Sequence, residues 1–287
     1  MNKIKNYKNN YILFIVLFII LFILLFSELD RRFGCNKDNQ KKCLYNLYEY
    51  YIKLFPLFII GFYNTLIRIL NPLHTHKFNV NNFESHYIIQ NRWKDIQKEA
   101  IKLYSNKNKL LNMRDIGVMN NFNTIDKEKG KWKVFVIKWY NKTLDNAKVL
   151  CPITSSIIDQ CPDIHVAMFS ILEPGKYIPP HKGPFTSCLR YHIGLKIPKD
   201  YKNCYINVNN ENFYWKEGEA FIFDDTYMHS VYNNTNEPRI ILFIDIERPL
   251  NSPLKEINKI LCKSVSIAKF NKGVNDRSEK NINLYHS

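Results

Sequence analysis

The sequence predicts a mainly β domain, a double-stranded β-helix (jelly roll) with flanking α-helices, preceded by an N-terminal transmembrane helix. Short runs of β-branched and aromatic residues recur from about residue 131 onward, and clusters of Pro, Gly and Asn separate them. This pattern is typical of a sandwich or jelly roll. A charge-free apolar run near the N-terminus predicts the transmembrane helix.

Length and composition set the broad class. The chain has 287 residues, 46% of them hydrophobic, with 19 Phe and 18 Tyr, which is enough to fill a large core and excludes global disorder. The net charge is +15. However, no dense Lys/Arg block is interleaved with aromatic residues, so we expect no nucleic-acid partner. The seven cysteines are odd in number and irregularly spaced, so they leave the presence of disulfides open.

The predicted membrane anchor covers residues 11–29, after a short basic tail (1–10). Its apolar part, YILFIVLFIILFILLF, contains no charge and as a helix would be ~24 Å long at ~1.5 Å per residue. A cleaved signal peptide is the alternative, but the following SELDRRFG offers no small-x-small cleavage site. Basic residues flank both ends, so a single-pass membrane protein is expected with its orientation open.

A membrane-proximal helical and linker region is expected over residues 30–83. Its apolar stretch 54–70 is interrupted by Pro56, Gly61, Asn64 and Arg68. Two interpretations remain for this stretch: a helix at the membrane interface or against the membrane-proximal face of the domain, and an ordinary buried helix. Residues 71–83 are expected to be a linker.

The predicted jelly-roll domain extends from residue 84 to residue 270. It opens with the helical pattern NRWKDIQKEAIKLY. The predicted strand runs follow, as WKVFVIKWY, VAMFSIL, YHIGLKIP, CYINV, AFIF and RIILFIDI. A last helix is expected from Leu254 to about Ala268, with Ser252 as its cap and Pro253 in its first turn. Residues 271–287 are expected to be a frayed tail.

Two histidines are candidate metal ligands. His181 follows Pro179-Pro180 at a turn, and His229 lies just before another strand run. A jelly roll brings such positions together at one mouth of its barrel, and imidazoles there suit Fe, Cu, Ni or Zn. Two unrelated loop histidines are the alternative. Gly183 stands where the usual non-haem iron motif has its carboxylate.

Other polar residues suggest an anion beside that metal. Arg190 and His192 point to one face of their strand. Arg239 lies in an apolar strand, where a buried guanidinium needs an anionic partner. Bidentate binding of a dicarboxylate co-substrate satisfies that need, and Ser170 could add a hydroxyl. The alternative is a structural ion pair with one of three carboxylates, Asp224, Asp225 or Asp245.

The chain resembles a known family in two blocks, FSILEPGKYIPPHKGP…LRYHIGLKIP and WKEGEAFIFDDTYMHSVYNNTNEPRIILFIDIERP. Over roughly residues 85–250 it is similar to the aspartyl/asparaginyl β-hydroxylases, Fe(II)- and 2-oxoglutarate-dependent dioxygenases whose iron lacks the carboxylate ligand. The resemblance implies that His181 and His229 hold Fe(II), that O2 is a co-substrate, and that no catalytic side chain lies beyond the metal site. It also implies contacts to 2-oxoglutarate from Trp132, Ser170, Arg190, His192 and Arg239.

The resemblance leaves the substrate open. The first expectation is hydroxylation of an unactivated C–H, the β-carbon of Asp or Asn residues in a protein. CPITSSIID and IDIERP resemble the lipid-hydroxylating (lipid A hydroxylase) branch as much, so the acyl chain of a membrane lipid is the alternative. A non-catalytic jelly-roll binding module is a third possibility, against which the complete set of site residues argues.

Overall fold

The computed structural model describes residues 60–70, 75–107, 110–116, 131–140, 142–266 and 269–279, all within one compact unit, Ile60–Ser287. The predicted basic tail, the predicted anchor at 11–29 and residues 30–59 lie outside the described residues. Within the described ranges, every helix is too short or too polar to cross a bilayer.

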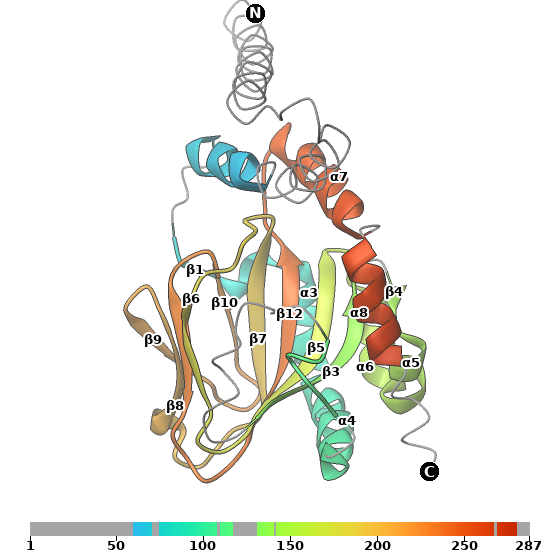
Figure 1. The fold of residues 1–287 in the computed structure, drawn as a ribbon, viewed down its shortest axis with the longest axis vertical. Helices are drawn as coiled ribbons and strands as arrows, with labels where there is room; N and C mark the ends of the chain where they lie inside the picture. Colours follow the sequence, from blue (N-terminus) through green and yellow to red (C-terminus); the bar gives the residue numbers. More distant parts are fainter. Residues whose placement is uncertain are drawn as a thin grey trace, which may run out of the picture. The chain divides into compact units, whose positions relative to one another are not determined.

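Two antiparallel sheets form the centre of the unit (Figure 1). The small sheet has the order β6-β11-β8-β9, and the large sheet has the order β1-β10-β7-β12-β5-β3-β2, with β4 paired to β3. The small-sheet strands are β6 (Tyr177–His181), β8 (Cys204–Val208), β9 (Glu211–Tyr214) and β11 (His229–Asn233). The large-sheet strands are β1 (Lys77–Phe78), β2 (Leu111–Asn112), β3 (Trp132–Trp139), β4 (Lys142–Thr143), β5 (Ile164–Leu172), β7 (Cys188–Lys196), β10 (Ala220–Phe223) and β12 (Arg239–Glu247).

The chain passes back and forth between the sheets. From β5 to β12 the strands belong in turn to the large, small, large, small, small, large, small and large sheet. This alternation is that of a jelly roll, in which the inner faces of the two sheets share one core. The mainly β prediction with flanking helices is confirmed.

The middle strands of the large sheet are buried along nearly their whole length, which explains their continuous apolar sequences. In β12 the run Ile240–Ile241–Leu242 is fully buried, and in β5 so is nearly every residue. Helices cover the face of the large sheet that the small sheet leaves open (Figure 1). These helices are α3 (Glu84–Asn91), α4 (Trp93–Ser105), α5 (Asp145–Leu150), α6 (Pro152–Asp159) and α8 (Lys269–Glu279); α7 (Leu254–Ser266) precedes α8.

Both predicted helices are present. The first is α4, which buries Ile96, Ala100 and Leu103 at helical spacing. The last is α7, which begins at Leu254 as expected. Two expectations differ from the structure. Part of the expected linker forms β1, which extends the large sheet by pairing with β10. Part of the expected frayed tail forms α8.

Helix α8 is held by polar contacts at its C-terminal end. The Glu279 carboxylate accepts the backbone N–H groups of Asp145 and Asn146 at 2.7 and 3.1 Å, where it caps the N-terminus of α5. Arg277 donates to the Ile116 carbonyl at 2.7 Å. These partners are distant in sequence, so local patterns gave no sign of an ordered helix.

A helical segment over residues 60–70 also packs on the domain. Its Tyr63 and Ile67 are buried in one cluster with Leu250 and Leu254. The Asn64 amide donates to the Pro184 carbonyl at 2.7 Å, next to the loop that follows His181. Over this part of the stretch 54–70, the structure therefore shows a helix packed against the domain.

Candidate active site

His181 and His229 face each other across the small sheet. His181 ends β6, His229 begins β11, and the two are direct partners in the β6–β11 ladder. Their ring centroids are 4.0 Å apart. The structure thus brings together the two histidines that the sequence predicted as metal ligands.

A β-bulge sets the direction of His181. In the β6–β11 ladder, Val231 pairs with Ile178 and His229 with His181, so one residue of β11 opposes two of β6. Those two are Pro179 and Pro180, which cannot donate ladder hydrogen bonds. β6 is an edge strand, where prolines and bulges are tolerated. The ladder resumes after the bulge with His181 opposite His229.

Backbone carbonyls orient both rings. His181 Nδ1 lies 2.8 Å from the Pro179 carbonyl, and His229 Nδ1 lies 2.9 Å from the Tyr227 carbonyl. A carbonyl only accepts, so Nδ1 carries the proton in each ring and the lone pair of the neutral ring is on Nε2. Such contacts fix the tautomer of metal-binding histidines.

The surroundings also keep both rings neutral. Burial, together with the neighbouring His229, lowers the pKa of His181 to about 4. Burial likewise lowers the pKa of His229. Neutral imidazoles are the form that binds a metal ion, so the pair fits the metal that the sequence implies.

The place of the missing carboxylate is filled from elsewhere. A Cβ at Gly183 would overlap the Asp225 carboxylate, and the Gly183 N–H donates to the Asp225 carbonyl at 2.7 Å. Only glycine fits beside Asp225 at this point. A carboxylate is therefore present next to His181, but residue 225 supplies it.

Arg190 has protein partners that the sequence analysis did not assign. Its Nε donates to Asp225 Oδ2 at 2.9 Å, its Nη1 pairs with Asp245, and its guanidinium lies 4.8 Å from the centre of the Phe243 ring. Arg190 thus fixes Asp225 against Gly183. Its expected contact to a co-substrate stays a prediction.

Arg239 is buried beside Ser170 and Trp132, as predicted. Only 3% of Arg239 is exposed; its Nη2 donates to Ser170 Oγ at 3.3 Å, and Trp132 Nε1 donates to the same oxygen at 3.0 Å. The guanidinium lies 4.7 Å from the centre of the Trp215 ring. Burial lowers the pKa of Arg239 to about 10, so the group remains a cation near pH 7.

No carboxylate pairs with Arg239 among the residues that the structure describes. The three aspartates considered as structural partners are engaged elsewhere: Asp224 pairs with Arg248, and Asp225 and Asp245 pair with Arg190. The structural ion-pair alternative for Arg239 is therefore wrong. A buried cation without an anion is costly. An unpaired buried arginine is therefore expected where a site binds an anion from outside.

Arg239 and two neighbouring side chains, His192 and Trp215, also have buried polar atoms without hydrogen-bond partners among the described residues. Within the described ranges, both ring nitrogens of His192, Nε of Arg239 and Nε1 of Trp215 are buried without a hydrogen-bond partner. The rings of His192 and Trp215 lie 6.1 Å apart, and burial, with Arg239 next, lowers the pKa of His192 well below its usual range. Buried polar groups are rarely unsatisfied, so this cluster fits the carboxylates of a bound co-substrate.

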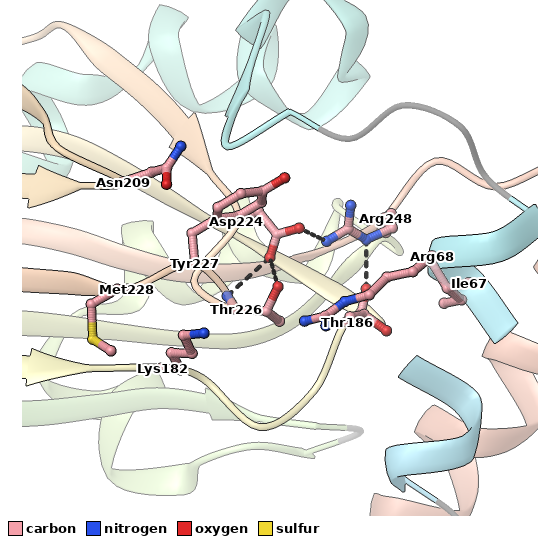
Figure 2. Close-up of a pocket in the computed structure, with 10 residues that line it drawn as sticks. All are labelled: Ile67, Arg68, Lys182, Thr186, Asn209, Asp224, Thr226, Tyr227, Met228 and Arg248. Carbon is pink, nitrogen blue, oxygen red and sulfur yellow. Dashed lines mark hydrogen bonds and ion pairs between the residues drawn. The ribbon is translucent and has the colours of Figure 1, made fainter. Parts of the chain in front are cut away.

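A hollow of about 360 Å³ lies on the side of the domain where the helix over 60–70 packs (Figure 2). Lys182 and Met228, the chain neighbours of His181 and His229, line it, and the helix over 60–70 contributes Ile67 and Arg68. On its wall, Arg248 pairs with Asp224 and donates to the Thr186 carbonyl at 2.5 Å. The hollow therefore combines apolar surface with two cations, Arg68 and Lys182, that have no carboxylate partner among the described residues.

Sequence reasoning did not assign Trp215, Asp225 and Asp245 to the site. Trp215 and Asp225 stand in the motifs WKEGEAF and FDD, so the signal was present. Their roles depend on contacts between strands, which spacing alone does not reveal.

Comparison with known proteins agrees with this geometry. A family model described as "Aspartyl/Asparaginyl beta-hydroxylase" matches residues 90–249. The chain is 36% identical over 171 residues to an ornithine lipid ester-linked acyl 2-hydroxylase from Rhizobium tropici, covering 59% of either protein. It is 29% identical over 170 residues to the human aspartyl/asparaginyl beta-hydroxylase, covering 58% of this chain and 21% of that protein. The match thus spans less than two thirds of each relative.

Solved structures give a weaker likeness. A cupin domain of Cnp3 from Schizosaccharomyces pombe matches 48% of this chain and 74% of its own with a TM-score of 0.30 and 13% identity. The jelly-roll assignment rests on the strand order. The family match covers more than half of the chain, including both predicted metal ligands and every predicted co-substrate contact, and so the chain belongs to the aspartyl/asparaginyl β-hydroxylase family.

Proposed function

We propose that this protein is an Fe(II)- and 2-oxoglutarate-dependent dioxygenase that hydroxylates an unactivated C–H bond. The observation that carries the proposal is the buried, anion-free cluster of Arg239, His192 and Trp215. It belongs to the same jelly roll as two neutral histidines that face each other. A metal-binding pair together with a buried guanidinium and unpartnered polar groups is what this co-substrate requires.

The side chains divide the work of binding. His181 and His229 hold the iron through Nε2, since carbonyls fix both Nδ1 protons. Arg239 and Ser170 bind the far carboxylate of 2-oxoglutarate, and Trp132 fixes the direction of the Ser170 hydroxyl. Iron, 2-oxoglutarate and O2 supply the oxidising chemistry when bound; the protein orients them and excludes water.

His192 and Arg190 complete the polar surround. His192 is neutral and can donate one N–H to a carboxylate on the iron side of the pocket. Arg190 acts through Asp225, whose carboxylate it holds beside Gly183 and His181. A negative charge close to the metal is thereby kept in place without a third protein ligand from position 183.

For the substrate, we propose the acyl chain of a lipid with an anionic group. The ornithine-lipid hydroxylase match has higher identity and far greater coverage of the relative than the human protein match. The hollow lined by the chain neighbours of the two histidines offers Ile67 and Met228 to an acyl chain, and Arg68 and Lys182 to an anion. The Asp/Asn β-carbon of a protein, which the human relative's name suggests, is the other outcome of the test.

Succinate formation tests both parts. The full chain is incubated with Fe(II), ascorbate and 2-oxoglutarate, with vesicles of an acylated anionic lipid or with peptides containing Asp and Asn. We expect the vesicles to stimulate succinate formation and to yield hydroxylated acyl chains, and we expect His229→Ala to abolish turnover. His86→Ala, checked for folding by circular dichroism, is the matched control, because His86 lies on α3, where its Nδ1 is 3.1 Å from the Tyr191 hydroxyl.

Other results have defined meanings. Stimulation by peptides alone would replace the lipid with an Asp/Asn substrate. Binding of 2-oxoglutarate without turnover on either substrate would favour a non-catalytic binding module. Turnover by His229→Ala equal to that of the wild type would reject the metal site.

The single-pass anchor at 11–29 and a membrane location stay predictions. Both would fit a lipid substrate.

A further inference from the structure

A second group of metal-ligating side chains lies apart from the paired histidines. His165, Cys188 and Cys262 each offer a ligand atom, and these three atoms all lie within 4.8 Å of one another. His165 is near the start of β5, Cys188 is the first residue of β7, and Cys262 is on α7. Ser170 lies near the opposite end of β5, where it contacts Arg239 at the start of β12. The group His165, Cys188 and Cys262 is therefore separate from the proposed co-substrate site.

The geometry suits a tetrahedral ion. Zinc binds thiolate at about 2.3 Å and imidazole at about 2.0–2.1 Å, which places neighbouring tetrahedral ligand atoms roughly 3.5–3.8 Å apart. Atoms already within 4.8 Å need only small side-chain movements to reach that spacing. Two sulfurs and one nitrogen form a donor set that favours zinc over magnesium or calcium.

The surroundings support a bound ion. Cys262 is 3% exposed. The Glu247 carboxylate lies 3.6 Å from Nε2 of His165, and Glu247 is the ladder partner of Cys188. A carboxylate beside a ligating histidine is the usual way to orient its ring.

The group also holds its own charge. The Cys188 thiol and the His165 ring lower the pKa of Cys262 to about 5, against the opposing effect of burial. Burial disfavours the His165 cation, but the neighbouring Cys262 and Glu247 outweigh it and raise the pKa of His165 to about 9. A metal ion would displace the protons of His165 and Cys188.

We propose that His165, Cys188 and Cys262 bind a zinc-class divalent cation, which fastens helix α7 to the large sheet. The three ligands come from β5, β7 and α7, so one ion would join elements far apart in the sequence. Glu247, 3.6 Å from Nε2 of His165, would orient the ring. This site is distinct from the proposed iron site and does not depend on turnover.

The test uses the full chain carrying His181→Ala and His229→Ala, so that the probe ion cannot bind the paired histidines. Metal-free protein is titrated with Zn²⁺, and separately with Co²⁺ as a spectroscopic probe. We expect about one ion per chain, a thiolate-to-cobalt charge-transfer band, proton release on binding, and a higher melting temperature with zinc. Glu247→Gln should weaken binding by ~10–100-fold, as expected for a residue that orients a ligand.

Matched cysteine variants decide the assignment. Cys188→Ala and Cys262→Ala should each remove the charge-transfer band, and Cys151→Ala, at a buried cysteine outside the group, should retain it. Circular dichroism checks that each variant is folded. An unchanged band in a folded Cys262→Ala variant, the absence of any thiolate band, or a Cys188–Cys262 disulfide in freshly purified protein would overturn the proposal.

Discussion

The two buried arginines of the domain predict opposite effects of the same substitution. Arg239 and Arg248 are 3% and 4% exposed. Arg248 pairs with the buried Asp224 carboxylate, whereas Arg239 has no carboxylate partner in the described ranges. We therefore expect Arg239→Met to leave stability nearly unchanged while removing 2-oxoglutarate binding, and Arg248→Met to lower stability.

The magnitudes follow from the contacts. A pKa of about 10 for Arg239, against an ordinary 12.5, corresponds to roughly 3 kcal/mol for holding the charge in the interior, at ~1.36 kcal/mol per unit. Its replacement removes this cost, but also removes stacking on Trp215 worth up to ~2 kcal/mol and one long hydrogen bond worth ~1 kcal/mol. These contributions nearly cancel.

Arg248→Met instead leaves the Asp224 carboxylate buried without its cation, which typically costs ~3–5 kcal/mol. Asp224 keeps hydrogen bonds from Thr226 at 2.9 and 2.7 Å, so we take the lower value of about 3 kcal/mol. For a domain of this size that corresponds to a drop in melting temperature of ~6–12 °C. The Arg239→Met variant should melt within ~3 °C of the wild type.

Thermal unfolding with Mn²⁺ in place of iron, over a titration of 2-oxoglutarate, measures both quantities. Wild type and Arg248→Met should be stabilised by the co-substrate at similar concentrations. Arg239→Met should need ~10–100-fold more, since it lacks a charge-assisted hydrogen bond worth ~1.5–3 kcal/mol. An unchanged 2-oxoglutarate dependence in Arg239→Met, or a larger loss of stability than in Arg248→Met, would refute the reasoning.

Three further substitutions and conditions extend these expectations. Gly183→Asp should yield little folded protein, because the new side chain overlaps the Asp225 carboxylate; soluble yield should recover when Asp225→Gly is added, and equal yields of both variants would contradict the overlap. Trp215→Phe should keep the melting temperature within a few degrees but raise the 2-oxoglutarate requirement, since it keeps a ring under Arg239 and deletes the unpartnered N–H; an unchanged requirement would remove that N–H from the pocket. In metal-free protein, His181 stays unprotonated down to about pH 4 while the unfolded chain takes up a proton near 6.5, so stability should fall as pH decreases from about 6.5 to 4; His181→Ala should reduce that decline in denaturant titrations.

Much of the fold was predictable because the strands are buried on both faces. β5 and β12 contain long apolar runs between turn residues. The amphipathic α4 was equally clear. β1 and α8 were not predictable, since β1 has two residues and α8 depends on contacts from Asn146 and Ile116.

The site was predictable where residue chemistry alone is unusual. A guanidinium in an apolar strand implies an anion, and that argument identified Arg239. The same argument could not show which aspartate pairs with which arginine, because the sequence offers three candidates, Asp224, Asp225 and Asp245. Strand register helps to decide this, since Asp245 is the ladder partner of Arg190. The group His165, Cys188 and Cys262 could not be predicted either, because its two cysteines are 74 residues apart in the sequence (262 − 188).

The two prolines before His181 make the metal site sensitive to residue number more than to residue type. If one proline were deleted, the bulge would disappear and a regular ladder from Ile178 would still place His181 opposite His229; deletion of both would place His181 opposite Ser230 and on the other face of the strand. Substitution of either proline keeps the alignment. Among related sequences, the stretch between Ile178 and His181 should therefore tolerate changes of amino acid and loss of the bulge residue, but not loss of both residues, and its length should identify chains that retain a working metal pair.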